Sequence, residues 1–167
     1  MKSFFKWVLR VLLIGICISF IYVGWDTEVI SKDDIWTNDM KMHDLKKNEI
    51  FYGTFFFSVD GLAPIWIKDI SLYAEDGKEL VDYEIYVFYD ETQKGIHPSG
   101  GHYDRKQFFV DFSLGLNKIE NIDKLKEKNF EVVALTSQNK CRNVICEITY
   151  KVWGVFDKKV TSRLLTL

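Results

Sequence analysis

The feature that most constrains this chain is its N-terminus, where three basic residues precede and interleave with a long apolar segment. Lys2, Lys6 and Arg10 are the only charged side chains before Asp26, and residues 11–25 (VLLIGICISFIYVGW) contain none. Basic-then-apolar order is typical of a segment that enters a membrane. A helix over residues 4–25 would be about 33 Å long, close to a hydrocarbon core of about 30 Å. The sequence therefore predicts a single N-terminal transmembrane helix, with residues 4–25 contacting the membrane.

Four fates of this segment are compatible with its sequence. An uncleaved anchor is favoured, because the bulky ring of Tyr22 opposes signal-peptidase cleavage after Gly24. Cleavage after Ser19 and lipidation of Cys17 are alternatives, and a buried helix of a soluble protein is the fourth. The positive-inside rule places the N-terminus in the cytoplasm and the C-terminal domain in the periplasm or another extracytoplasmic space.

Charge separates the rest of the chain from this segment. The chain has 22 basic and 24 acidic residues, and three of the basic ones fall within residues 1–25, which leaves a net charge of −5 on residues 26–167. Such a balance argues against a nucleic-acid partner, which requires a basic surface. We expect three parts: residues 1–25 as cytoplasmic stub and membrane anchor, 26–49 as a polar spacer, and 50–167 as the extracytoplasmic domain.

Residues 50–167 are dominated by strand patterns. The alternation of Val81, Tyr83, Ile85, Val87 and Tyr89 is the clearest example. Glu75-Asp76-Gly77-Lys78 predicts a hairpin turn, and a change of inward face near Lys68-Asp69 predicts a bulge. About seven strands are expected, over residues 50–59, 65–73, 81–89, 108–114, 130–136, 144–156 and 160–165.

One segment of this domain has a helical pattern instead. Leu116, Ile119, Ile122 and Leu125 fall near one helical face within residues 116–129. The fold class that these patterns favour is an all-β, mainly antiparallel sandwich with one short helix, and a closed barrel is the alternative. In general pattern only, this arrangement resembles immunoglobulin-like modules.

The cysteines bear on the cellular compartment. Cys141 and Cys146 flank a predicted hairpin turn at Arg142-Asn143, and paired strands would bring them to disulfide distance. We therefore expect a Cys141–Cys146 disulfide if the domain faces an oxidising space. Two reduced thiols packed in the core are the alternative, and a zinc site is disfavoured because no second ligand pair lies near.

The strongest candidate for chemistry is the loop that holds two of the three histidines. His97, His102 and Asp104 could bind a divalent metal, with His43 or Asp90 as a further ligand. An exposed loop without a ligand is the plainer interpretation. We expect no other cofactor and no catalytic residues, since no nucleophile-elbow, zinc-protease or phosphate-loop motif occurs.

Aromatic residues also occur on the side of the strands that otherwise carries polar residues. They indicate either that another element of the protein covers this side of the sheet or that it is a contact surface for a partner. Phe56, Tyr86 and Phe88 are the candidates for a partner surface. Taken together, the patterns predict a membrane-anchored binding or accessory domain in a protein assembly of the cell envelope. The alternatives are an immunity-type inhibitor of an incoming toxin and a metal-dependent hydrolase that uses His97, His102 and Asp104.

Overall fold

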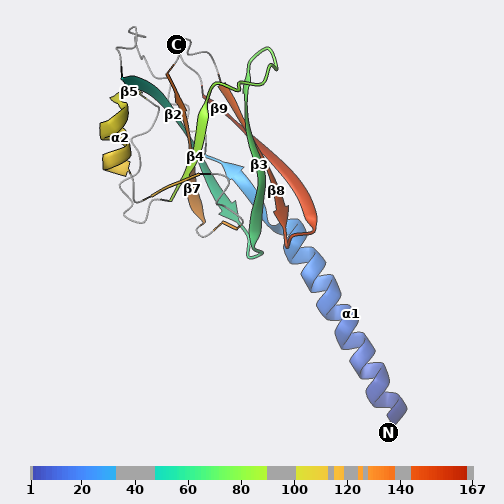
Figure 1. Cartoon of the computed structure of the whole chain (residues 1–167). Coiled ribbons are helices and arrows are strands. Elements are labelled where there is room, and N and C mark those ends of the chain that lie inside the picture. Colours follow the sequence, from blue (N-terminus) through green and yellow to red (C-terminus); the bar gives the residue numbers. More distant parts are fainter. Residues whose placement is uncertain are drawn as a thin grey trace.

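The structure is a computed structural model of the whole chain. It describes residues 2–32, 48–89, 101–112, 115–118, 124–125, 128–137 and 144–164. A long helix, α1 (Lys2–Asp26), leads into a domain built from β-strands (Figure 1). The strands are β1 (Glu28–Ser31), β2 (Glu49–Asp60), β3 (Ile65–Ala74), β4 (Glu84–Phe88), β5 (Gly101–Asp104), β6 (Leu116–Lys118), β7 (Asn129–Thr136), β8 (Val144–Val152) and β9 (Phe156–Leu164), and a second helix, α2 (Arg105–Phe112), follows β5.

The strands form two antiparallel sheets that pack face to face as a sandwich. The larger sheet has the order β1-β2-β7-β4-β6, and β5 pairs with the same edge of β2 as β1 does, farther along the strand. The smaller sheet has the order β3-β8-β9. The predicted two-sheet, mainly antiparallel architecture is thus confirmed, whereas the immunoglobulin-like pattern is not.

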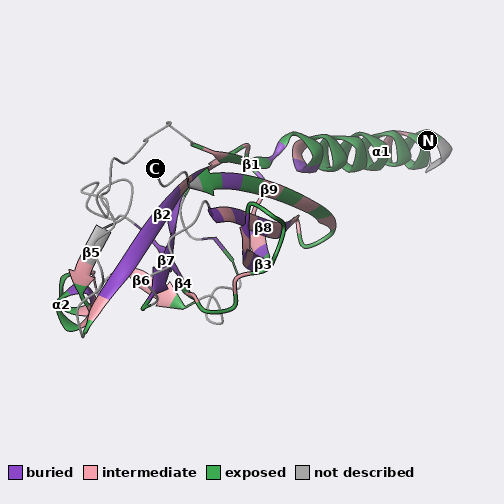
Figure 2. Ribbon diagram, turned by 90° about the horizontal axis from the view of Figure 1, so that it is seen from above, coloured by how far each residue is buried: buried purple, intermediate pink, exposed green. Residues whose placement is uncertain are grey.

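The main core lies between the two sheets, and a second core lies on the opposite face of the larger sheet. Phe57 and Val132 face the smaller sheet, where they meet residues such as Ile148. Tyr52 and Val133 face the other way, toward α2. Because both faces of β2 are covered, almost its whole length is buried (Figure 2). This double burial explains why the sequence of β2 is continuously apolar rather than alternating.

The short helix α2 covers a segment for which the alternation of apolar residues predicts a strand. Residues 108–114 were expected to be extended, but Arg105–Phe112 is α2. Asp104 is the N-cap of this helix: its carboxylate accepts the backbone N–H groups of Lys106 at 2.9 Å and Gln107 at 3.0 Å. Capping satisfies N–H groups that the first helical turn leaves unpaired, which starts the helix there.

The prediction of a helix within residues 116–129 is wrong for the first three residues of that range. Leu116–Lys118 forms β6, which pairs antiparallel with β4. Leu125 is buried against the main core, and its N–H donates to the carbonyl of Ile65 at 2.9 Å. Pairing with β4 gives the backbone of residues 116–118 a hydrogen-bonding partner that local helical periodicity could not anticipate.

Two local predictions for β3 are confirmed. The register of β3 against β8 shifts between Ile67 and Asp69, as expected for a bulge. Gly77 has a φ of +81°, and its N–H donates to the Ala74 carbonyl at 2.8 Å, which closes the predicted turn. After this turn the chain pairs with β3 only at the isolated bridge between Tyr73 and Glu79. It then crosses from the smaller sheet to the larger one, where β4 pairs with β7 and β6, so β3 and β4 do not form a hairpin.

The spacer expected over residues 26–49 begins as ordered structure. Asp26 ends α1, and Glu28–Ser31 already pairs with β2. Only Thr27 separates the helix from the first strand. Helix and sandwich are therefore joined directly, and the remainder of the expected spacer, residues 33–47, lies outside the described part of the chain.

Candidate functional site at the junction of helix and sandwich

The end of α1 is fixed to the sandwich through Thr27, which is fully buried. Its hydroxyl donates to the Val23 carbonyl at 2.8 Å and accepts the Ala63 N–H at 3.1 Å. The first bond closes the last turn of the helix, and the second reaches the loop between β2 and β3. One side chain therefore binds both the helix and the sandwich, and it uses its donor and an acceptor position to do so.

Lys158 of β9 caps the same helix end from 131 residues away in sequence. Its Nζ donates to the carbonyl oxygens of Trp25 at 2.6 Å and Thr27 at 2.8 Å. The last carbonyls of a helix lack intrahelical donors and carry partial negative charge, so a cation is favourable at this position. The ammonium group thus stabilises the helix end and joins it to β9.

Aromatic packing extends the junction along the helix. The ring of Trp153, in the turn between β8 and β9, stacks on Phe20 of α1 with centroids 4.4 Å apart. Gly24 lies so close to this turn that a Cβ there would come within 2.9 Å of Trp153 and 2.8 Å of Phe156. A glycine at this position permits the close approach.

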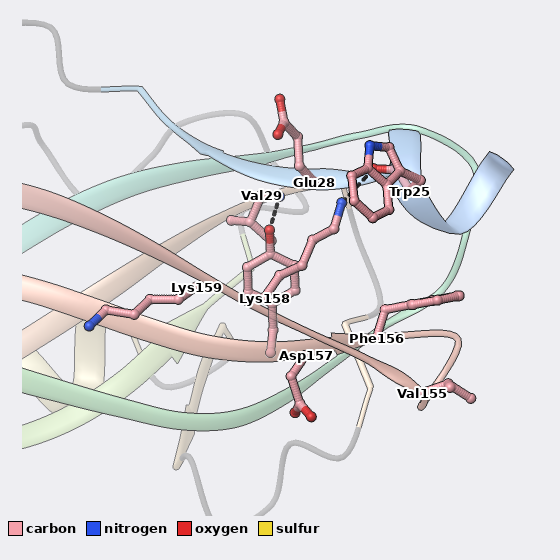
Figure 3. Close-up of a pocket in the computed structure, with 9 residues that line it drawn as sticks. Trp25, Glu28, Val29, Val155, Phe156, Asp157, Lys158 and Lys159 are labelled. Atoms are coloured by element: carbon pink, nitrogen blue, oxygen red, sulfur yellow. Dashed lines mark hydrogen bonds between the residues drawn. The ribbon is translucent and has the colours of Figure 1, made fainter. Parts of the chain in front are cut away.

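A pocket of about 610 Å³ opens beside the junction, between β1 and β9 (Figure 3). Its volume falls in the range of small-ligand sites. Val29 of β1 and Tyr150 of β8 form part of its wall, and the Val29 N–H donates to the Tyr150 hydroxyl at 2.9 Å. The other lining residues are apolar or charged: Trp25, Val155, Phe156, Glu28, Asp157, Lys158 and Lys159.

The pocket combines a buried phenol with charged side chains. Burial raises the pKa of Tyr150, the Val29 N–H opposes this shift, and the nearby Glu28 carboxylate adds to it. The phenol is therefore neutral at physiological pH and keeps its proton as a hydrogen-bond donor. Glu28, Asp157, Lys158 and Lys159 bring both signs of charge to the pocket. Three of them also have partners within the chain: the Trp25 and Thr27 carbonyls for Lys158, Glu147 for Lys159 and Lys68 for Asp157.

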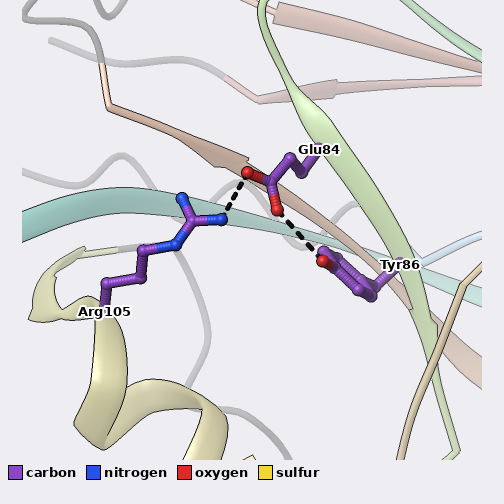
Figure 4. Close-up of polar contacts among 3 residues, drawn as sticks. All are labelled: Glu84, Tyr86 and Arg105. Atoms are coloured by element: carbon purple, nitrogen blue, oxygen red, sulfur yellow. Dashed lines mark hydrogen bonds and ion pairs between the residues drawn. The ribbon is translucent and has the colours of Figure 1, made fainter.

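A second polar cluster joins α2 to the larger sheet. Arg105 at the start of α2 forms an ion pair with Glu84 of β4, with Nη2 and Oε1 2.5 Å apart (Figure 4). The other oxygen of Glu84 accepts the Tyr86 hydroxyl at 3.0 Å. The hydrogen bond from Arg105 lowers the pKa of Glu84, partial burial opposes the shift, and the Tyr86 bond assists it. This cluster holds α2 over the sheet, and its side chains are committed to one another.

The predicted metal ligands fall largely outside the described residues. His43, Asp90 and His97 are among the residues that the structure does not describe, and His102 lies in β5. Asp104 has the capping role described above. Within the described ranges, no group of three His, Cys, Asp or Glu side chains is placed to hold a metal. The metal site on His97, His102 and Asp104 thus stays a prediction.

The predicted partner surface is largely covered. Tyr86 and Phe88 are 8% and 9% exposed, because α2 packs over them. Their rings contact Phe109 and Phe112 edge-on, with centroids 5.7 and 6.3 Å apart. Phe56 is half-buried on β2. Tyr86 and Phe88 therefore belong to the second core, which is the covered-face alternative for these two residues.

The predicted disulfide involves Cys141, which lies outside the described residues. Cys146 is fully buried on β8, within the core between the sheets. The strands on either side of this segment, β7 and β8, belong to different sheets. β7 and β8 therefore do not form the hairpin that the predicted pairing requires, and the Cys141–Cys146 disulfide stays a prediction.

Sequence reasoning missed the residues of the junction. Lys158 and Trp153 acquire their roles only when segments more than 100 residues apart meet. Thr27 acquires its role when the end of α1 meets a loop 36 residues later in the chain. No local pattern marks them. For α2, by contrast, a signal was present: Asp104 followed three residues later by Gln107 has the spacing of a helix N-terminus with a capping box.

Comparisons with family models, with curated proteins and with solved structures found no match to this chain.

Proposed function

We propose that this protein is a single-pass membrane protein whose sandwich acts as a binding or accessory domain in a protein assembly of the cell envelope. The observation that carries the proposal is α1. It is the one helix in the described part of the chain that is long and apolar enough to cross a membrane. Residues 11–22 are all exposed, with Leu12 58% and Ile18 61% accessible. An apolar surface of this extent requires a covering, and a bilayer supplies it.

The dimensions of α1 support a full crossing. The 23 residues of Phe4–Asp26 rise about 34 Å, against a hydrocarbon core of about 30 Å. Trp7 and Trp25 lie near opposite ends, where indole rings favour the two interfaces. The basic residues Lys2, Lys6 and Arg10 support a cytoplasmic N-terminus by the positive-inside rule, and we propose on this ground that the sandwich lies in the periplasm or another extracytoplasmic space.

The pocket between β1 and β9 supports a binding role. It contains aromatic, apolar and oppositely charged groups, and it lies beside the end of α1. A partner that fits this position is another protein of the same membrane, whose extracytoplasmic segment places aromatic and charged side chains into the pocket. An immunoglobulin-like pattern of the sandwich belongs to this proposal as well, but a fold alone assigns no function, so the binding role is argued from the pocket.

Topology is tested with two reporters fused after Leu167 of the full chain. A phosphatase that is active only outside the cytoplasm should give activity, and a reporter that works only in the cytosol should not. Cytosolic activity would overturn the membrane topology and, with it, the envelope function. A phosphatase found in the soluble extracytoplasmic fraction would mean that α1 is a cleaved signal peptide and not an anchor.

The binding role is tested by affinity capture of the full chain from its native membrane in mild detergent. We compare Glu28→Lys, which reverses a charge in the pocket, with Asp82→Lys, which makes the same change on an exposed residue that does not line it. A partner retained by the wild type and Asp82→Lys, but lost from Glu28→Lys, supports the proposal. Equal capture by both variants would show that the pocket is not the binding site.

The identity of the captured partner decides among the functions. A resident envelope protein supports the accessory role, whereas a basic toxin from outside would replace it with the immunity-type inhibitor. The same purified chain is analysed for bound metal. Stoichiometric metal that depends on His97 would favour the hydrolase.

A further inference from the structure

Two loops at the base of the sandwich expose apolar side chains beside the end of α1. Leu62, in the loop between β2 and β3, is 84% exposed, and Val155, in the turn between β8 and β9, is 66% exposed. Figure 1 shows that this turn and the start of β3 lie at the end of the sandwich that receives α1. We define the base as Gly61–Pro64 and Trp153–Val155 together with Trp25, which is 76% exposed.

Hydrogen bonds join the base to the end of α1 and join the two loops of the base to each other. Thr27 accepts the N–H of Ala63, and the N–H of Trp153 donates to the carbonyl of Pro64 at 3.1 Å. The first bond connects the end of α1 to the loop between β2 and β3, and the second connects that loop to the turn between β8 and β9. The height of Leu62 and Val155 relative to α1 is therefore fixed by the fold.

The stack of Trp153 on Phe20 sets the depth of the base. Phe20 precedes Trp25 by five residues, which places it about 7 Å farther along the helix toward the N-terminus. With Trp25 at the level of the headgroups, the ring of Trp153 then lies below that level, beside the apolar part of α1. The turn that carries Trp153 must accompany it to the membrane surface.

From this geometry we infer that the base of the sandwich is a lipid-binding surface, with Leu62 and Val155 inserted into the headgroup region and Trp153 against the acyl chains. The inference rests on the proposed membrane crossing of α1 and adds a second contact with the same bilayer. Exposed apolar loop tips beside an interfacial tryptophan are the composition that favours this depth. The sandwich is consequently held against the membrane in one orientation.

The test places a photoreactive benzophenone residue at single positions of the full chain, reconstituted in vesicles of phosphatidylethanolamine and phosphatidylglycerol. The positions are Val155, Leu62, Val110 and Leu13. Val110 is the matched control, because it is a valine of similar exposure, 68%, on α2 and away from α1. Leu13 lies within α1 and reports whether the helix is in the bilayer.

After irradiation, mass spectrometry should find phospholipid adducts at Val155, Leu62 and Leu13, and none above the unirradiated background at Val110. Adducts at Leu13 without adducts at Val155 and Leu62 would overturn the inference and leave the membrane crossing intact. Absence of adducts at Leu13 would overturn the crossing and the inference with it. Equal labelling of Val110 and Val155 would show unselective lipid contact and would also overturn the inference.

Discussion

Gly61 illustrates how a single residue determines the junction. Its φ of +111° lies in a region that residues with a side chain rarely adopt. A Cβ at this position would also overlap the hydroxyl and the Cα of Thr27. The contact between Thr27 and the loop thus depends on glycine for two independent reasons, backbone conformation and space.

The first prediction compares two glycines with positive φ. Gly61→Ala should lower the free energy of unfolding by roughly 3 kcal/mol or more, since it adds a steric overlap to the backbone strain. Gly77→Ala, at a φ of +81° with open space around its Cβ position, should cost only roughly 1 to 2 kcal/mol. Urea denaturation in mild detergent measures both. Equal losses would show that the close approach of Gly61 to Thr27 is unimportant.

Glu84 and Arg105 give the clearest pH dependence at this scale. The pKa of Glu84 is lowered in the folded chain from its ordinary value of 4.5. A depressed pKa means that the unfolded chain takes up the proton more readily, so the ion pair stabilises the fold above pH 4.5. That contribution is lost as the pH falls through the folded pKa. Because both side chains are partly exposed, the effect is modest.

The second prediction follows from this sign. At neutral pH, Arg105→Gln should lower the free energy of unfolding by less than about 1 kcal/mol. Below pH 4.5 the difference from the wild type should shrink, because Glu84 becomes neutral in both. Lys106→Gln, on the same helix and exposed, is the control and should show no such trend. A difference that stays constant into the acid range would rule out the pair as its source.

At the scale of elements, the two helices begin or end where a distant or local group satisfies their backbone. Asp104 starts α2 by capping, and the helix then places Phe108 and Phe112 over the larger sheet. Lys158 performs the opposite task at the C-terminal end of α1. The first interaction is local in sequence and the second is not, yet both meet the same electrostatic requirement of a helix end.

The third prediction concerns this C-terminal cap. Lys158→Met keeps the aliphatic stem and removes both hydrogen bonds to α1, so we expect a loss of about 2 kcal/mol in the free energy of unfolding. Lys159→Met removes a surface ion pair with Glu147 and should cost less than about 1 kcal/mol. Thermal unfolding in detergent, followed by near-ultraviolet circular dichroism, compares the two. A ranking in the reverse order would contradict the capping role.

At the scale of the whole molecule, α1 and the sandwich form one body. Three N–H groups across the connection have acceptors: Thr27 donates to Val23, Val29 to Tyr150, and Lys32 to Phe56. A flexible spacer would leave such groups to water. Any tilt or rotation of α1 in a bilayer is consequently transmitted to the sandwich.

The fourth prediction tests this coupling by hydrogen exchange. The amides of Thr27 and Val29 should exchange as slowly as those of β2 rather than at the rate of an open linker. Gly24→Ala, which would crowd Trp153 and Phe156, should accelerate exchange at Thr27. Gly15→Ala, where a Cβ meets nothing within 4 Å, is the control and should have no effect. Linker-like exchange in the wild type would mean that helix and sandwich move independently.

The sequence alone determined those features that arise from local chemistry. The apolar, charge-free residues 11–25 indicate the one long helix, because membrane helices are defined by composition and length. Asp76-Gly77 fixes the turn after β3, and the change of face at Lys68-Asp69 fixes the bulge, since both depend on neighbouring residues only. Strand patterns also predict a mainly antiparallel β domain, but they are compatible with both a sandwich and a closed barrel, and only the structure shows two separate sheets.

The tertiary structure alone decided which faces are covered and how the helix meets the sandwich. Tyr86 and Phe88 have the same sequence pattern whether they bind a partner or lie under α2. Only the structure shows that α2 buries their side chains. Residues 116–118 become a strand only because β4 offers hydrogen bonds to their backbone. The cap on α1 joins Lys158 to Trp25 and Thr27 across most of the chain. Periodicity and propensity describe neighbours in sequence, whereas these contacts are set by neighbours in space.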